Sequence, residues 1–251
     1  MSLPLGLGLG LGIGTQAASS EEAWSPADAS VPLLAWFKAD AGVTQAGGLV
    51  SAWADQSGSG DANRNQSAAG ADRPSYSASD AGYGGKPVLT GNGSQFLASA
   101  GDWSTAPTPP ITVIVVGHAT ANSSFVGDPA NNNMLYVSGG HEATYGINNG
   151  ALVGSGDASA PTVIMYTDTG AAGGSAANIY NRDLSTPTGT DIKRWEGVAR
   201  LDMLADFAGA FTPLIGAVAE IIVLGGIPNA TDLTNLKTYL NTTRAYGLAV
   251  T

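Results

Sequence analysis

Large aliphatic residues alternate with glycine through the first part of this chain. Every odd position from Leu3 to Ile13 is a large aliphatic residue, and every even position from Gly6 to Gly14 is glycine. A period of two is typical of a strand, here with one apolar face and one bare face. We therefore expect residues 1–14 to form an extended apolar docking arm. Its partner-docking residues are Leu3, Leu5, Leu7, Leu9, Leu11 and Ile13.

The free energies of docking and of ordering this arm nearly cancel. Burial of the six aliphatic side chains contributes about 1.5–3 kcal/mol each. Fixing the backbone costs roughly 1–2 kcal/mol per residue, and glycine is the most costly residue to fix. The arm should therefore become ordered when a partner supplies a groove or an open sheet edge, as in strand addition.

Two other interpretations of this segment are a secretory signal peptide and a membrane span. Residues 17–19 offer a cleavage region, but no Lys or Arg precedes Lys38, and half of the apolar stretch is glycine. The apolar stretch is also shorter than the roughly 20 residues that a membrane helix needs. The docking arm is favoured, and a leader peptide stays the alternative.

Short apolar runs separated by turn signals follow the arm. Residues 15–30 are acidic and rich in Ala and Ser, which is typical of a linker. Strands are expected at residues 33–38, 49–54, 111–116, 123–126, 134–138, 143–147, 162–167, 176–181, 197–204 and 215–224. The run at 111–116 is β-branched throughout, so we expect burial on both of its faces. The spacing of these runs, with Gly and Asn between them, predicts an antiparallel sandwich or jelly roll.

Turns and one helix complete the expected elements. Residues 55–84 are rich in Asp, Asn, Ser and Gly and predict a surface loop or a set of turns, and residues 148–150 (NNG) predict a hairpin turn. Residues 231–245 predict a helix with Asn229 or Thr231 as its N-cap, packed on the outside of the sandwich. Its apolar stripe consists of Leu233, Leu236, Tyr239 and Leu240.

Several segments together resemble a known family. Residues 35–43 (AWFKADAGV), residues 50–58 (VSAWADQSG) and the closing run 219–224 (AEIIVL) resemble the laminin-G-like and concanavalin A-like lectin–glucanase domains of phage and bacterial structural proteins. The resemblance covers roughly residues 31–249. It implies an all-β fold, an antiparallel jelly-roll β-sandwich over residues 31–251 with one short C-terminal helix. Residues 91–96 (GNGSQF) depart from the acidic turn of the family, so a calcium site is not expected there.

Composition narrows the classes of partner. Only 12% of the residues are charged, the formal net charge is −10, and no basic run occurs. Without a patch that neutralises phosphates, binding to nucleic acid or to an anionic membrane is disfavoured. Cysteine is absent, which excludes disulfides, thiolate nucleophiles and cysteine metal sites.

The sequence gives little support for a catalytic site. Glucanases of this fold need Glu-x-Asp-x-x-Glu on one strand, and no Glu of this chain has Asp two residues later. Glu220 lies on the right kind of strand, but we expect it to face solvent or a loop. His118 and His141 are expected to be isolated surface or turn residues, and no Gly-x-Ser-x-Gly motif occurs. The sequence therefore predicts a protein that is not an enzyme.

Binding chemistry is limited to two features. The Asp- and Asn-rich stretch 55–65 offers oxygen ligands for calcium, but it lacks EF-hand spacing, so a solvated loop and no cofactor are expected. Aromatic side chains at a loop end could stack on sugar rings, with burial in the core as the alternative. The candidate glycan contacts are Trp103, Tyr136, Tyr145 and Trp195.

The arm and the missing catalytic set lead to one expected function. We expect a structural virion protein of a tailed phage: a capsid decoration, fibre or tail-associated subunit. Its arm would bind other virion proteins, the subunit would form homo-oligomers, and the sandwich would project outward with some capacity for host glycans. The alternative is a secreted carbohydrate-binding module, and an enzyme acting on a polysaccharide is the least favoured.

Overall fold

The computed structural model describes most of the chain beyond the arm. The described residues are 23–129, 134–137, 142–147, 150–170, 177–191, 195, 198–204 and 213–251. For residues 134, 142–147, 150–156, 190 and 191 the description covers the strand but not the side chain. The docking arm lies outside these residues, with its predicted contacts Leu3, Leu5, Leu7, Leu9, Leu11 and Ile13. His141 also lies outside them.

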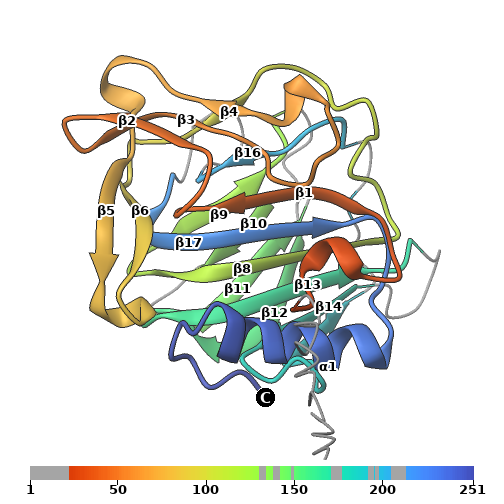
Figure 1. Ribbon diagram of the computed structural model, residues 1–251. Coiled ribbons are helices and arrows are strands. Elements are labelled where there is room, and N and C mark those ends of the chain that lie inside the picture. The colour runs from red at the N-terminus through yellow and green to blue at the C-terminus, as the bar shows by residue number, and fades with distance from the viewer. Residues whose placement is uncertain are drawn as a thin grey trace, which may run out of the picture.

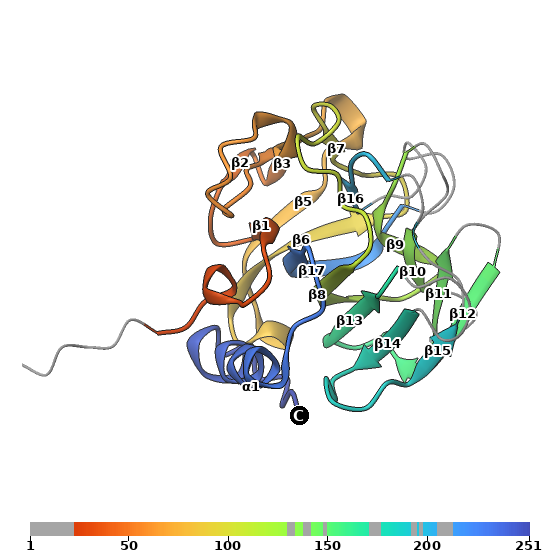
Figure 2. The ribbon, with the colours of Figure 1, turned by 90° about the vertical axis from the view of Figure 1, so that its right-hand side faces the viewer.

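The chain folds into an antiparallel β-sandwich with one short C-terminal helix, so the predicted fold class is confirmed (Figures 1 and 2). One sheet has twelve strands. In chain order they are β1 (Leu33–Lys38), β2 (Val43–Ala46), β3 (Leu49–Trp53), β4 (Gln66–Ser67), β5 (Ser75–Asp80), β6 (Lys86–Asn92), β7 (Ala98–Ser99), β8 (Ile111–Ala119), β13 (Thr162–Asp168), β14 (Ala177–Asn181), β15 (Gly189–Asp191) and β17 (Ile215–Leu224). Their central order is β14-β13-β8-β17-β6-β5.

Two smaller sheets lie against the large one. The first contains β9 (Ser123–Gly127), β10 (Met134–Val137) and β16 (Asp202–Met203), and the second is the hairpin of β11 (Glu142–Ile147) and β12 (Gly150–Asp157). Ile147 pairs with Gly150, which confirms the hairpin predicted at residues 148–150. Figure 2 shows β9 and β10 facing β8 and β17 across the interior.

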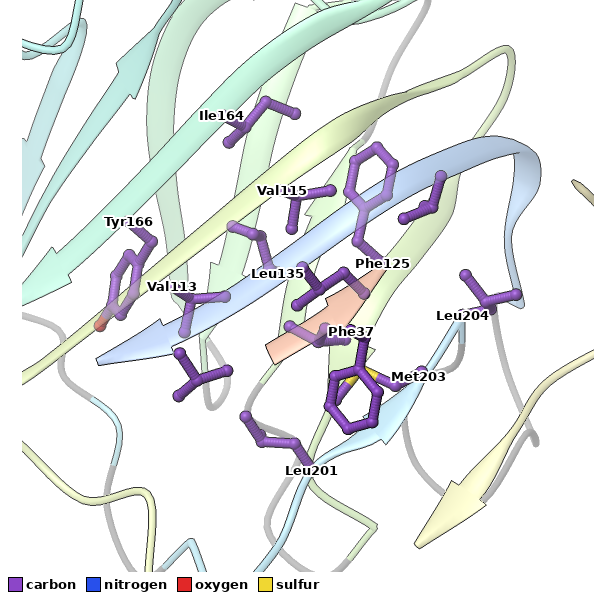
Figure 3. Close-up of a cluster of buried hydrophobic side chains, with 14 of the residues drawn as sticks. Phe37, Val113, Val115, Phe125, Leu135, Ile164, Tyr166, Leu201, Met203 and Leu204 are labelled. Carbon is purple, nitrogen blue, oxygen red and sulfur yellow. The ribbon is translucent and has the colours of Figure 1, made fainter. Parts of the chain in front are cut away.

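Apolar side chains fill the space between the layers. Phe125 of β9 and Leu135 of β10 lie in one cluster with Phe37, Val113 and Val115 of the large sheet (Figure 3). A second cluster covers the opposite face of the same sheet and includes the alternate residues of β8. Residues 111–116 are therefore buried on both faces, as their β-branched composition predicts.

The C-terminal helix seals this second, outer cluster. Helix α1 (Ala230–Thr238) continues into a π-helical turn, η5 (Tyr239–Thr243), and ends earlier than the predicted residue 245. The Asn229 side chain caps it by accepting hydrogen bonds from the Thr231 and Asp232 backbone N–H groups at 2.8 and 2.9 Å. The stripe residues Leu236, Tyr239 and Leu240 are buried on the outside of the sandwich, as predicted.

Short 3₁₀ helices and polar strands were not predicted. The helices are η1 (Pro26–Asp28), η2 (Ala62–Arg64), η3 (Gly70–Asp72) and η4 (Ala81–Tyr83). Residues 55–84 form more than a loop, because they contain β4 and β5, whereas the strand expected at 197–204 shrinks to β16. Part of the expected linker is folded, since Trp24 and Ala29 pack against the outer cluster.

One edge of β17 changes its neighbour halfway along the strand. Residues 215–218 pair with β6, whereas residues 220–224 pair with β1. At the change, the Ala39 N–H donates to the Ala219 carbonyl at 2.9 Å, and a β-bulge interrupts the pairing of β17 with β8. The bulge adds one residue, so Val218 and Ile221 face the interior while Ala219 and Ile222 face the outer cluster. β1 and β6 therefore separate here.

Candidate functional site

A hollow of about 160 Å³ lies at the place where β1 and β6 separate. One side follows Ala39, which bonds to Ala219 of β17. The other side follows Tyr76 of β5, because Tyr76 pairs with Leu89 and Leu89 pairs with Val218. Two consecutive residues of β17 thus fix both walls. The lining residues are Ala39, Asp40, Ala41, Gly42, Val43, Gln45 and Tyr76.

The turn between β1 and β2 forms the rim of this hollow. The Ala41 N–H donates to the Lys38 carbonyl at 3.0 Å, and the Ala54 N–H donates to the Gly42 carbonyl at 2.8 Å. Gly42 has a φ of +74°, and a Cβ atom there would lie 2.7 Å from the Ala54 carbonyl oxygen. Glycine is therefore required for the turn to lie this close to the segment that follows β3.

Three side chains give the hollow its chemistry. Tyr76 is half-buried and packs against the inner core, whereas Asp40 and Gln45 are exposed. Gln45 is oriented by the Gly48 N–H, which donates to its Oε1 at 3.0 Å. An aromatic ring beside a carboxylate and an amide suits a ligand with an apolar face and several hydroxyl groups. Drug-sized ligands occupy pockets of roughly 300–1,000 Å³, so this hollow accommodates about one sugar ring.

Asp40 is held in place from behind the hollow by Arg244. Arg244 Nη1 donates to Asp40 Oδ2 at 2.7 Å. Partial burial alone would raise the pKa of Asp40, but the hydrogen bond and charge of Arg244, with the charge of Lys38, hold that pKa below its ordinary value. Asp40 is therefore an ionised acceptor at neutral pH.

Glu220 anchors Arg244 in the outer cluster. Its Oε1 accepts from Trp36 Nε1 at 2.5 Å and from the Tyr239 hydroxyl at 2.6 Å. Its Oε2 accepts from the Tyr246 hydroxyl at 2.6 Å and from Arg244 Nε at 3.1 Å. Four donors thus surround a carboxylate that is 0% exposed.

The expectation that Glu220 faces solvent or a loop is wrong. The bulge beside Ala219 turns Glu220 toward the outer cluster, beneath the C-terminal segment. The sequence does contain its donors, but they come from β1 and from the end of the chain. Only the tertiary fold brings them together.

The predicted glycan contacts lie away from the hollow. Trp103 is 5% exposed and Trp195 is 1% exposed, so protein covers both rings. Trp103 Nε1 donates to Ser99 Oγ at 3.0 Å, and Trp195 stacks on Tyr166 with ring centroids 5.3 Å apart. Tyr136 is half-buried on β10, and Tyr145 belongs to β11, where side chains are not described. The sequence did not point to Asp40, Gln45 or Tyr76, although Asp40 lies within the segment that carries the family resemblance.

A second hollow, of about 210 Å³, lies over the loop at residues 55–65. Asp55 Oδ1 accepts from the Trp36 N–H at 2.8 Å, and the Gln56 N–H donates to the Trp36 carbonyl at 2.7 Å. The buried Arg64 guanidinium donates to the Leu34 carbonyl. The loop thus covers the edge of β1 that β17 leaves open, which protects it from pairing with another chain.

The acidic residues of this loop do not form a metal cluster. Within the described ranges, no three His, Asp or Glu side chains are grouped so that they could hold a metal ion. Asp55 is already used by the edge of β1 and by Ser57, whose N–H and hydroxyl donate to its two oxygens at 3.0 and 2.5 Å. The loop is thus a structural cover for β1.

His118 is not the isolated surface residue that we expected. Its Nδ1 lies 2.8 Å from the Tyr83 hydroxyl, and the two rings stack with centroids 6.0 Å apart. Burial lowers the pKa of His118, and the charge of Asp80 opposes this shift. The pair ties β8 to the turn at η4 and takes no part in the hollow.

The fold and the hollow define an antiparallel β-sandwich with a small polar surface site. No protein-family model and no curated protein matches the chain. Among solved structures it is similar to domain 4 of AbnA, a GH43 extracellular arabinanase from Geobacillus stearothermophilus, at 12% identity with a TM-score of 0.50 over 82% of this chain and 98% of that one. It is also similar to Trypanosoma rangeli sialidase, at 13% identity with a TM-score of 0.52 over 84% of this chain.

These likenesses establish the fold, a sandwich shared with domains of glycosidases. The chain spans 33% of the length of the sialidase. The laminin-G-like part of the sequence resemblance remains a prediction. No helix in the described part of the chain has the length and apolar character to cross a membrane.

Proposed function

We propose that this chain is a carbohydrate-binding β-sandwich that holds one sugar ring in the hollow beside Tyr76. The observation that carries the proposal is the meeting of Tyr76, ionised Asp40 and Gln45 in a hollow that the strand arrangement itself creates. The ring of Tyr76 would contact the apolar face of the sugar, and the two polar side chains would bond to its hydroxyl groups.

The neighbouring structures support this class of ligand. The arabinanase domain is seen in complex with arabinotriose, and the sialidase in complex with 2,3-difluorosialic acid. A sandwich of this kind therefore occurs in proteins that handle glycans. For this chain the corresponding role is a proposal.

We propose further that the protein binds without catalysing hydrolysis. Glycoside hydrolysis uses two carboxyl groups on either side of the scissile bond. Glu220, which lies on a strand of the kind that such an enzyme would use, is buried and already accepts four hydrogen bonds. In the hollow, Asp40 is engaged by Arg244.

The test is calorimetric titration with a panel of neutral oligosaccharides, arabinotriose included. We expect weak binding, because a site for one ring makes few contacts, with Kd on the order of 0.1–1 mM. Replacing Tyr76 by Leu keeps apolar packing but removes the ring, and should weaken binding about tenfold or more, which corresponds to about 1.4 kcal/mol.

The matched control is Tyr180→Leu. Tyr180 is a half-buried tyrosine on β14, and it does not line the hollow. This variant should bind like the unchanged protein. Equal losses in both variants, or no binding by any neutral oligosaccharide, would refute the glycan site.

A second role, as a structural subunit of a phage virion, is proposed for the arm. The described chain begins beside the helix (Figure 2), and Trp24 there meets Tyr239 edge-on with ring centroids 6.1 Å apart. The described chain thus starts at the outer face of the sandwich. In this role, residues 3–13 would dock on a neighbouring virion protein or on a second copy of the chain. The alternative is a secreted module, in which residues 1–14 belong to a leader.

A further inference from the structure

We propose that Arg244, oriented by Glu220 and Tyr246, is a positioning residue that fixes Asp40 as the acceptor for hydroxyl groups of an uncharged sugar ring. This inference rests on the proposed glycan site for its ligand, but the positioning itself can be tested without any ligand. It assigns a role to the buried Glu220, which on a fold shared with glycosidase domains would otherwise be taken for a catalytic acid.

The guanidinium of Arg244 is fixed through all three of its nitrogen atoms. Nε donates to Glu220 Oε2 at 3.1 Å and to the Tyr246 hydroxyl at 3.1 Å, and Nη2 donates to the same hydroxyl at 2.9 Å. Nη1 is left to bind Asp40 Oδ2 at 2.7 Å. Because the guanidinium is planar and rigid, fixing two of its nitrogens sets the direction of the third.

Stability alone is a weak reason to bury such a network. Glu220 is 0% exposed, and the Arg244 side chain is 12% exposed. Well-packed apolar side chains of similar volume are often as stable as a buried ion pair or more so, because removing charges from water is costly. What an apolar cluster cannot do is deliver a directed N–H group to the rim of the hollow.

The charges around Asp40 favour an uncharged ligand. The single positive charge of Arg244 is shared between Glu220 and Asp40, and its side chain is largely buried. Lys38, the other cation that acts on Asp40, lies over the Trp36 ring at 4.1 Å. Among the residues that line the hollow, Asp40 is the charged one. An anionic sugar would therefore bring its carboxylate against Asp40 without a cation in the lining.

Two tyrosines provide a matched pair of variants. The Tyr239 and Tyr246 hydroxyls each donate to Glu220 at 2.6 Å, but of the two only the Tyr246 hydroxyl also accepts hydrogen bonds from the Arg244 guanidinium. Both Tyr→Phe changes remove one hydroxyl and leave the net charge unchanged. A role limited to stability predicts similar effects of the two variants on the hollow.

The first readout is the Asp40 carboxyl titration, followed by NMR on the full chain without ligand. Tyr246→Phe should move the pKa of Asp40 upward, toward its ordinary value of 3.8, because Arg244 is less firmly aimed at it. Tyr239→Phe should leave this pKa unchanged. If both variants move it equally, or neither moves it, the positioning role is overturned. Arg244→Lys, which keeps the charge but loses the fork, gives an independent check and should also raise it.

The second readout is affinity for arabinotriose and for an oligogalacturonate of the same length. Tyr246→Phe should weaken arabinotriose binding at least threefold, whereas Tyr239→Phe should not weaken it. The unchanged protein should bind the oligogalacturonate at least tenfold more weakly than arabinotriose. Equal affinity for the two sugars would overturn the uncharged ligand. If the unchanged protein binds no sugar while the variants shift the pKa of Asp40 as expected, the glycan site is refuted and the positioning role stands.

Discussion

Buried carboxylates of this protein are satisfied to very different degrees. Four donors surround Glu220, whereas Asp202 on β16 accepts a hydrogen bond from the Ser99 N–H at 2.9 Å and lies 3.8 Å from Arg200 Nε. Asp202 is 2% exposed, and Asp128 lies nearby and is buried as well. Burial raises the pKa of Asp202 to about 6, and Asp128 adds to the shift while Ser99 and Arg200 oppose it.

The raised pKa of Asp202 predicts a loss of stability with rising pH. The folded value of about 6 exceeds the ordinary value of 3.8, so the folded state binds more protons between these pH values. The stabilisation that protonated Asp202 contributes is complete below pH 3.8 and is lost as the pH rises through about 6. Asp202→Asn should therefore match the unchanged protein near pH 4 and exceed its unfolding free energy at pH 7.5 by roughly 2–3 kcal/mol.

Urea unfolding at a series of pH values measures this difference. The control is Asp102→Asn, which also removes one carboxyl group, but at a side chain that is 74% exposed. Parallel pH profiles for Asp202→Asn and the unchanged protein would contradict the assignment.

Among the elements, the start of β17 depends on close approach to β6 and β8. Its residue Gly216 pairs with Gly91 of β6 and with Ala119 of β8. A Cβ atom on Gly91 would lie 2.3 Å from the Leu214 carbonyl oxygen, and one on Gly216 would lie 2.0 Å from the His118 carbonyl oxygen. Glycine at both positions lets three strands meet at the start of β17.

Gly91→Ala should therefore destabilise the large sheet. The obstructing atom belongs to the backbone and cannot rotate away, so a cost of about 1–3 kcal/mol is expected. Thermal unfolding measures it, with Gly101→Ala as the control, because a Cβ there meets nothing closer than 3.4 Å. An unchanged midpoint for Gly91→Ala would contradict the close contact between β6 and the start of β17.

The same elements show what the sequence could predict. The β-branched run at 111–116 and the run at 215–224 become β8 and β17, because an apolar run of that length must be buried. β5 was not predicted, because Ser, Ala and Asp dominate its sequence. It becomes a strand because it pairs with β6. The hollow was not predicted for a related reason. Asp40 and Tyr76 meet only through the registers of β1, β5 and β6 along β17, which local patterns do not encode.

At the scale of the whole molecule, the proposed attachment and the proposed sugar binding belong to different parts of the chain. The described residues that form the two apolar clusters of the sandwich all lie beyond the arm. Deletion of residues 2–14 should therefore leave the thermal midpoint and the affinity for sugar unchanged. It should also reduce the assembly that the arm is proposed to form, as measured by light scattering after size-exclusion chromatography. A deletion variant that forms assemblies with the same number of subunits as the full chain, or one that is less stable, would contradict the proposed role of the arm.

An NMR titration of the full chain with arabinotriose, followed residue by residue, tests directly whether the hollow binds a sugar. A sugar ring bound in the hollow should cause saturable shifts that cluster at Asp40, Gln45 and Tyr76, with little change over residues 55–65. Shifts centred on the 55–65 loop, or none up to about 10 mM ligand, would contradict a sugar site in this hollow.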